Sequence, residues 1–266
     1  MLKGIAGRTA LVTGAGGRIG AAVCRRLRTE GAKVVAVDRD KSALDALAAD
    51  LAAEFGPETG AELLTVEADV TSAEDTERFF AAAVERFGSV DLFHANAGIE
   101  GVVSDVAHLD IADVDRVLSV NVRSVFLGAG AAVRQMSEQP TRGNILFTSS
   151  IAGLMGNAGV SPYVASKHAV IGIMRSLTKE IGPLGIRVNC LCPGVVESRM
   201  MDSLEAGIGA MAGLNDAEVK AALLAAVPMN RYAQVDEIAA TAAWLLSDEV
   251  PYMHGEVVTV GGGIYP

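Results

Sequence analysis

The chain has 266 residues, of which 50% are hydrophobic and 20% are charged, and its net charge at pH 7 is −10. A chain of this size buries a large core and an α/β domain of this length need not be split, so we expect one domain over residues 1–266. The acidic balance repels phosphate backbones, which argues against a nucleic-acid partner. The N-terminal sequence has no long apolar run, so we expect neither a signal peptide nor a membrane partner.

Short apolar runs alternate with longer amphipathic stretches along the chain. In chain order we expect strand Thr9–Thr13, helix Ile19–Thr29, strand Lys33–Val37, helix Ser42–Phe55, strand Leu63–Val66, helix Ala73–Phe87, strand Asp91–Ala95, one or two helices within Ile111–Met136, strand Gly143–Thr148, helix Tyr163–Ile181, strand Arg187–Leu191, helix Val235–Leu246 and strand Glu256–Val260. Strands that are apolar throughout predict a parallel sheet covered on both faces. The expected fold is therefore an α/β, three-layer, doubly wound Rossmann fold with a seven-stranded parallel sheet.

The three cysteines, Cys24, Cys190 and Cys192, are odd in number, and their spacing is not that of a disulfide framework or a zinc site. We expect them to be small apolar core residues, which fits a reducing, cytoplasmic location. The four histidines have no spacing typical of metal ligands, so no metal site is predicted.

A glycine-rich turn follows the first strand directly and opens the first helix, in the sequence TGAGGRIG at residues 13–20. Small residues let the backbone approach a pyrophosphate, and the helix N-terminus offers free N–H groups and a partial positive charge. This position between strand and helix predicts a dinucleotide site. The contacts that we expect from the turn come from Gly14, Gly17, Arg18, Ile19 and Gly20.

Asp38 ends the second strand, where a carboxylate is expected to hold the adenosine ribose. Its charge disfavours a 2′-phosphate at about 4 Å by on the order of 4 kcal/mol per unit charge at a surface-like dielectric, which predicts NAD over NADP. Arg39, which we also expect at the cofactor, and Arg18 oppose this preference if they swing in to neutralise a phosphate.

Tyr163 and Lys167 stand four residues apart at the start of an expected helix, on one face. The ordinary pKa of a phenol is about 10, and a cationic neighbour lowers it. The pair is therefore a candidate acid/base for a hydroxyl or carbonyl group, although the spacing alone also arises by chance.

Together these motifs resemble the short-chain dehydrogenase/reductase family, over essentially the whole chain. Thr13, Gly14 and Gly20 match its first motif, whose middle glycine is moved by one place because Arg18 stands there. The resemblance implies adenine contacts from Asp69 and Val70, a turn after the fourth strand formed by Asn96, Ala97 and Gly98, and nicotinamide contacts from Pro193, Gly194, Val196 and Ser198.

The same resemblance implies a catalytic tetrad of Asn121, Ser150, Tyr163 and Lys167. Ser150 is chosen over Ser149 because it lies thirteen residues before Tyr163. In the implied mechanism Tyr163 accepts the alcohol proton and Lys167 keeps it charged while binding the nicotinamide ribose. Ser150 orients the substrate oxygen and Asn121 holds a water that links Lys167 to solvent.

The substrate is expected between residues 151–160 and a flap at residues 199–227, a stretch outside the strand–helix rhythm that we interpret as two short helices. The side chains that we expect to contribute are Leu154, Met155, Asn157, Val160, Met200, Met201, Leu204, Ile208, Met211, Leu214, Leu223 and Leu224. Methionine suits an adaptable apolar pocket, although these residues are also suited to packing the flap. The expected substrate is an apolar, uncharged secondary alcohol or ketone, while Arg199 and Arg231 leave an acidic group open.

Two other functions stay open on the sequence. One is an NADPH-dependent 3-oxoacyl thioester reductase, against which Asp38 and the acidic charge count. The other is a non-catalytic NAD-binding interaction protein, against which the complete tetrad counts. The resemblance also implies a homotetramer, or a dimer, with helices from Ile111–Met136 and Tyr163–Ile181 at one interface.

Overall fold

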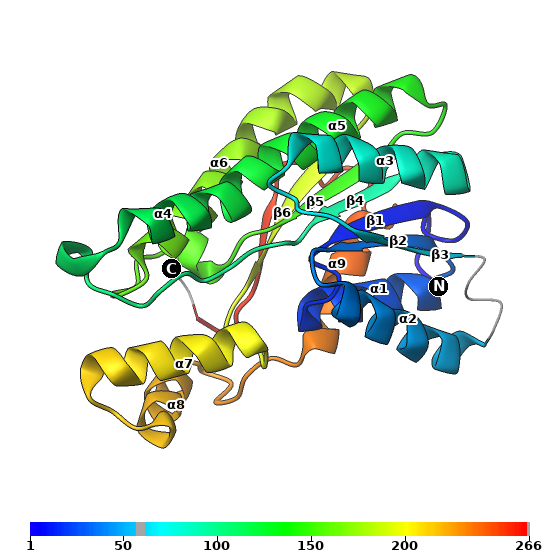
Figure 1. The fold of residues 1–266 in the computed structure, drawn as a ribbon. Coiled ribbons are helices and arrows are strands. Elements are labelled where there is room, and N and C mark those ends of the chain that lie inside the picture. The colour runs from blue at the N-terminus through cyan, green and yellow to red at the C-terminus, as the bar shows by residue number, and fades with distance from the viewer. Residues whose placement is uncertain (57–61, 265–266) are drawn as a thin grey trace.

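The computed structural model describes residues 1–56 and 62–264, and its centre is one parallel sheet with helices on both faces (Figure 1). The strands are β1 (Thr9–Thr13), β2 (Lys33–Asp38), β3 (Leu63–Glu67), β4 (Leu92–Ala95), β5 (Asn144–Thr148), β6 (Arg187–Pro193) and β7 (Val257–Val260). Their order across the sheet is β3-β2-β1-β4-β5-β6-β7. The predicted fold class and strand number are confirmed.

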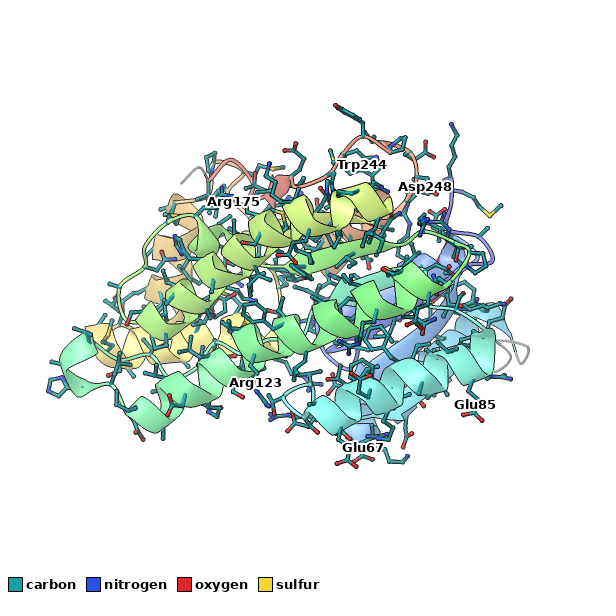
Figure 2. The ribbon with its side chains drawn as sticks, turned by 90° about the horizontal axis from the view of Figure 1, so that it is seen from above. Glu67, Glu85, Arg123, Arg175, Trp244 and Asp248 are labelled. Atoms are coloured by element: carbon teal, nitrogen blue, oxygen red, sulfur yellow. The ribbon has the colours of Figure 1, made fainter. Side chains whose placement is uncertain are left out.

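Helices cover the sheet in two layers, one on each face (Figures 1 and 2). The helices are α1 (Arg18–Thr29), α2 (Lys41–Phe55), α3 (Ala73–Phe87), α4 (Ile111–Leu118), α5 (Ser124–Glu138), α6 (Ser161–Ile181), α7 (Arg199–Ala212), α8 (Asp216–Ala225) and α9 (Val235–Leu246). Successive strand residues point to opposite faces of the sheet and pack in two separate cores. Leu11 and Val35 pack with α3, α5 and α6 on one face, and Val12 and Val34 pack with α1, α2 and α9 on the other. This explains why the strands are apolar on both faces.

The order in which successive strands are added to the sheet reverses between β1 and β4, although all strands remain parallel. β2 and β3 lie on one side of β1, and β4 to β7 lie on the other. In doubly wound sheets a crevice opens at such a switch point, outside the carboxyl ends of the strands. The fold therefore directs the loops after β1 and β4 to one place.

The stretch predicted as one or two helices is a continuous 28-residue helical segment, Ile111–Glu138. A π-helical turn, Ser119–Arg123, joins α4 to α5 and contains Asn121. The segment is long and apolar enough to cross a membrane by length and composition alone. In the structure its buried residues pack against the sheet and neighbouring helices. Arg123, labelled in Figure 2, donates a hydrogen bond to the carbonyl of Thr71, which lies two residues before α3.

The predicted flap consists of α7 and α8, which stand apart from the sheet (Figure 1). Ser198 caps α7 by accepting a hydrogen bond from the N–H of Met201, and Asn215 and Glu218 form a capping box on α8. Only Gly209 in α7 and Val219 in α8 are buried. Because local hydrogen bonds rather than core packing define these helices, they form a wall beside the crevice rather than part of the core.

Candidate functional site

A cleft of about 880 Å³ lies at the carboxyl ends of the strands, bounded by the flap. It is large enough for a dinucleotide together with a small substrate. Nearly every residue predicted from the sequence to touch cofactor or substrate lines it. The predicted cofactor and catalytic residues in its wall are Gly14, Gly17, Arg18, Ile19, Gly20, Asp38, Arg39, Asp69, Val70, Asn96, Ala97, Gly98, Ser150, Tyr163, Lys167, Pro193, Gly194, Val196 and Ser198.

The glycine-rich turn is fixed by close approaches that only glycine permits. Gly14 has φ +66°, and a Cβ there would lie 2.8 Å from the Cα of Ala97. A Cβ at Gly20 would lie 2.1 Å from the carbonyl oxygen of Gly14. The turn therefore presses against both the turn after β4 and the first turn of α1, which puts backbone rather than side chains at the cleft wall.

The N-terminus of α1 is left free for an anion. Its N-cap, Gly17, provides no side-chain hydrogen bond, and its first turn contains no acidic residue. Gly17, Arg18 and Ile19 all line the cleft. Uncapped N–H groups and the partial positive charge of the helix fit a pyrophosphate at this point.

Asp38 lies at the end of β2 beside this turn. Its Oδ2 accepts a hydrogen bond from the N–H of Gly16 at 2.9 Å, and its Oδ1 accepts one from the N–H of Asp40 at 3.0 Å. The carboxylate is thus held at the cleft wall, where its remaining lone pairs suit ribose hydroxyl donors. Arg18 and Arg39 line the same end, together with Arg199, which the sequence did not place there.

A hydrogen-bond network joins the ends of β1, β4 and β5. The hydroxyl of Thr13 accepts from the N–H groups of Asn96 at 3.1 Å and Ala97 at 3.2 Å. The Asn96 amide donates to the Thr13 carbonyl at 3.1 Å and accepts from the Thr148 hydroxyl at 3.3 Å. His94 lies 2.7 Å from the same hydroxyl, through its Nε2.

Only one assignment of protons satisfies these bonds. Since the Thr148 hydroxyl donates to Asn96, it accepts from His94, which places the imidazole proton on Nε2. His94 is fully buried and its Nδ1 has no hydrogen-bond partner among the described residues. Burial lowers the pKa of His94 to about 3, so the imidazole stays neutral near pH 7. Each donor in the network then keeps the same acceptor, from His94 to Thr148 to Asn96.

Ser150 and Ser149 have different environments that separate their roles. The Ser149 hydroxyl donates to the carbonyl of Lys167 at 2.8 Å and so serves the backbone of α6. The Ser150 hydroxyl caps the short 3-10 helix Ile151–Gly153 and forms a hydrogen bond that lowers the pKa of Tyr163. The Ser150 hydroxyl therefore faces the phenol, and its catalytic role stays a prediction.

Tyr163 and Lys167 lie one turn apart on α6, with the Lys167 Nζ 5.5 Å from the centroid of the phenol ring. The expected lowering of the phenol pKa by Lys167 is wrong for this state of the protein. Burial raises the pKa of Tyr163 to about 12, and the charge of Glu100 raises it further, against the Ser150 hydrogen bond. Burial also lowers the pKa of Lys167 to about 8, so the ammonium itself is costly here.

Asn121 lies next to this pair, but its side chain does not line the cleft. Its amide donates to the carbonyl of Ile99 and accepts from the Ile99 N–H, both at 2.8 Å, and it donates to the Ser166 hydroxyl at 2.9 Å. A Cβ at Gly98 would lie 3.2 Å from the Lys167 Nζ and 3.3 Å from the Asn121 Oδ1. The observed role of this side chain is therefore to hold the turn after β4 against α6.

The substrate half of the cleft is lined mainly by apolar side chains from the two predicted segments. Those that line it as expected are Met155, Asn157, Val160, Met200, Met201, Leu204, Ile208, Met211 and Leu223. Leu154, Leu214 and Leu224 do not line it, and Leu154 packs against the core instead. Arg231 is not in the wall either, because it forms a two-fold ion pair with Glu237.

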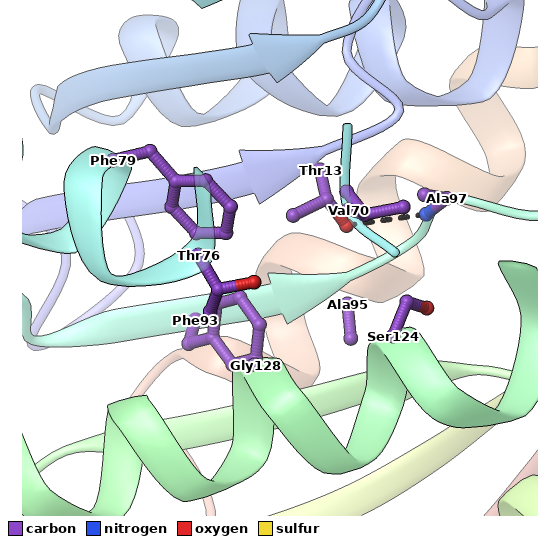
Figure 3. Close-up of a pocket in the computed structure, with 9 residues that line it drawn as sticks. All are labelled: Thr13, Val70, Thr76, Phe79, Phe93, Ala95, Ala97, Ser124 and Gly128. Atoms are coloured by element: carbon purple, nitrogen blue, oxygen red, sulfur yellow. Dashed lines mark hydrogen bonds between the residues drawn. The ribbon is translucent and has the colours of Figure 1, made fainter. Parts of the chain in front are cut away.

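A second, much smaller cavity of about 10 Å³ lies between β1, β4, α3 and α5 (Figure 3). It has room for one water at most. The hydroxyls of Thr13, Thr76 and Ser124 in its wall already have protein partners, and the rings of Phe79 and Phe93 form its apolar side. It is a packing gap behind the network rather than a ligand site.

Comparisons with known proteins agree with this geometry. Residues 8–209 match the family model described as short chain dehydrogenase. The chain is 37% identical over 256 residues to a levodione reductase of Leifsonia aquatica, covering 96% of this chain and 93% of the relative. It is 32% identical to a 3-oxoacyl-[acyl-carrier-protein] reductase of Staphylococcus aureus, covering 97% and 98%. A solved structure titled NAD+-bound xylitol dehydrogenase superposes with a TM-score of 0.90 at 32% identity, covering 98% of this chain and 100% of that one.

The buried His94 predicts a pH dependence of stability. The unfolded chain takes up a proton below about pH 6.5, which the folded chain refuses until about pH 3. The free energy of unfolding therefore falls as the pH drops through this window, by up to about 1.4 kcal/mol per pH unit. Above about pH 6.5 the neutral His94 causes no such loss of stability. We expect His94→Gln, which keeps an N–H near the same place, to remove this slope in urea unfolding at pH 4–7. His168→Gln is the control, since that ring is exposed; equal slopes in wild type and His94→Gln would contradict the prediction.

Proposed function

Because the chain belongs to the short-chain dehydrogenase family, whose members are oxidoreductases of alcohols and ketones that use nicotinamide cofactors, we propose that it transfers a hydride between NAD(H) and an apolar secondary alcohol or ketone. The observation that carries this proposal is the convergence of Ser150, Tyr163 and Lys167 on the cleft that also holds the glycine-rich turn and Asp38. The nicotinamide ring supplies or accepts the hydride when bound. The chain's own residues bind, orient and handle the proton.

Tyr163 is the proposed acid/base. With its pKa raised to about 12 by burial, the phenol stays protonated in the free protein and is suited to donate to a carbonyl oxygen. Ser150 shares that oxygen through its hydroxyl and fixes its position. Lys167, whose Nζ donates to the Thr148 carbonyl at 3.1 Å, is the cation that favours the phenolate once the proton has moved.

NAD is the proposed cofactor, rather than NADP. Asp38 is the carboxylate fixed beside the expected ribose position, and it disfavours a 2′-phosphate there. The relative whose title names bound NAD+ superposes over almost the whole chain, which supports the same choice.

The 3-oxoacyl thioester reductase remains a second candidate because a relative at 32% identity bears that name. The long apolar wall formed by the flap would suit an acyl chain. Turnover of acetoacetyl thioesters with NADPH that exceeds turnover of simple ketones with NADH would favour this candidate over the first.

We also propose a homotetramer in solution. The helical segment α4–α5 exposes Ile111, Leu118 and Phe126, whose exposed fractions are 68%, 37% and 60%. Apolar side chains that gather along one helix face are typical of an interface. Light scattering should give about four times the chain mass of 27.5 kDa, and Phe126→Glu should lower it; a wild-type monomer would contradict this proposal.

Removal of the Tyr163 hydroxyl should separate chemistry from binding. Tyr163→Phe removes the acid/base but keeps the ring, so kcat should fall by about 10²–10⁴-fold, the usual contribution of such a group. The Kd for NAD, measured by calorimetry, should change by less than about threefold. Tyr232→Phe is the matched control, because that hydroxyl hydrogen-bonds Glu205 and lies outside the cleft. Near wild-type turnover by Tyr163→Phe would refute the assigned role.

The carboxylate of Asp38 should set cofactor preference. Asp38→Asn keeps the shape and removes the charge, so the ratio of kcat/KM for NAD over NADP should fall at least about tenfold. Glu67→Gln is the control, since Glu67 pairs in register with Asp38 on β3 but lies outside the cleft. A wild-type preference for NADP, or equal ratios in both variants, would count against the proposal.

A further inference from the structure

Glu100 places a carboxylate at the Tyr163 end of the cleft, where no sequence motif predicted one. It lies two residues after Gly98, in the turn that follows β4, and it lines the same cleft as Tyr163. Its side chain is half-buried. No described residue forms a hydrogen bond or an ion pair with it, so the acceptor capacity of this carboxylate is unused.

The backbone holds Glu100 in place from both sides. Before it, both backbone groups of Ile99 are hydrogen-bonded to the Asn121 amide at 2.8 Å. After it, the N–H of Val102 donates to the Asp113 Oδ2 at 2.7 Å, and Gly101 adopts φ +76° against Val117 and Asp113. The backbone position from which the Glu100 side chain extends is therefore set by buried anchors on α4 and on the π-helical turn.

The charges along the cleft are divided between its two ends. Arg18 and Arg39 line the cleft at the same end as Asp38. Arg199 belongs to this end too, because its charge acts on the nearby Asp40. The pKa of Asp40 is lowered mainly by hydrogen bonds from Ser42 and Ala43, and Arg199 adds to that effect. At the other end the only charged side chains in the wall are Glu100 and Lys167, among the described residues. Lys167 is 3% exposed, donates to the Thr148 carbonyl and forms no ion pair with Glu100 among the described residues, so its charge does not neutralise this carboxylate by direct contact.

The electrostatics of Tyr163 agree with this placement. Burial is the largest cause of its raised pKa, and the charge of Glu100 adds to the rise. A carboxylate that acts on the phenol in this way also acts on any charge that a substrate brings near the reacting carbon. Apolar walls on the remaining sides, including Met155 and Met211, offer no compensation.

We propose that Glu100 is a specificity-determining residue that excludes substrates with a negative charge near the reacting carbon and admits neutral or cationic ones. This rests on the proposed function, because it concerns the substrate of the same site. It also distinguishes an anionic from a cationic ketone of equal size, whereas apolar walls disfavour both charges alike through desolvation.

The test compares two ketones that differ mainly in charge, acetoacetate and its methyl ester, each with NADH. Wild type should prefer the ester in kcat/KM. Glu100→Gln keeps the size of the side chain and removes its charge, so the ester-to-acid ratio should fall about tenfold, the value for unit charges ~6 Å apart at an effective dielectric of about 40. Asp40→Asn removes one charge from the adenosine end and keeps the cap on α2, so its ratio should stay as in wild type.

Each outcome decides the proposal. A ratio unchanged in Glu100→Gln, or changed equally in Asp40→Asn, overturns the role of Glu100 while the proposed function stands. If no variant reduces either ketone, binding of the pair is followed by saturation-transfer NMR. Improved binding of acetoacetate to Glu100→Gln then supports the proposal without the reaction, and a cleft that binds neither ketone overturns both.

Discussion

The contact between the glycine-rich turn and the turn after β4 is the constraint on which the rest of the site depends. Gly14 meets the backbone of Ala97 so closely that a single added carbon would collide with it, and the Thr13 hydroxyl and the Asn96 amide bind the two turns together. Parallel strands end at one edge of a sheet, and these contacts set how closely the loops that leave β1 and β4 approach each other. The cofactor end and the catalytic end of the cleft share this junction.

Burial, rather than pairing, dominates the electrostatics of the catalytic end. It raises the pKa of Tyr163 and lowers that of Lys167, so both groups are driven toward their neutral forms. The fold opposes this only in part, through the Ser150 hydrogen bond and the Thr148 carbonyl. A buried network headed by the neutral His94 keeps that carbonyl in place without introducing another charge. Burial thus keeps Tyr163, the proposed acid/base, in its protonated state.

The sequence predicted the sheet and most of the cleft wall because these follow from local patterns. Continuous apolar strands, the turn at residues 13–20 and Asp38 at a strand end each carry their own signal, and the structure gathers them as expected. The pKa of Tyr163 could not be predicted, since spacing on a helix says nothing about burial. Asn121 lies in a π-helical turn, and its amide hydrogen-bonds Ile99. No residue pattern in the sequence predicted this π-helical turn.

Glu100 and His94 had no motif of their own, and each matters because of what surrounds it. In the sequence His94 is one residue of a strand, and only the structure shows that it hydrogen-bonds Thr148 on the neighbouring strand β5. Glu100 belongs to a turn whose conformation is imposed by Asn121 and Asp113, both distant in sequence. A signal was present in retrospect: Glu100 stands two residues after Gly98, in the loop that leaves the carboxyl end of β4, where doubly wound sheets bind their ligands.

The flap completes this division between fixed and adaptable parts. Its helices bury almost nothing of their own, and their stability comes from caps and short-range contacts. Segments with so little buried apolar area open at low cost, while the sheet edge beneath them does not. Methionine side chains on the flap and a carboxylate on a well-anchored backbone turn then act differently on a substrate. The wall tolerates variation in shape, because it can repack, whereas Glu100 discriminates by charge from an anchored stretch of backbone.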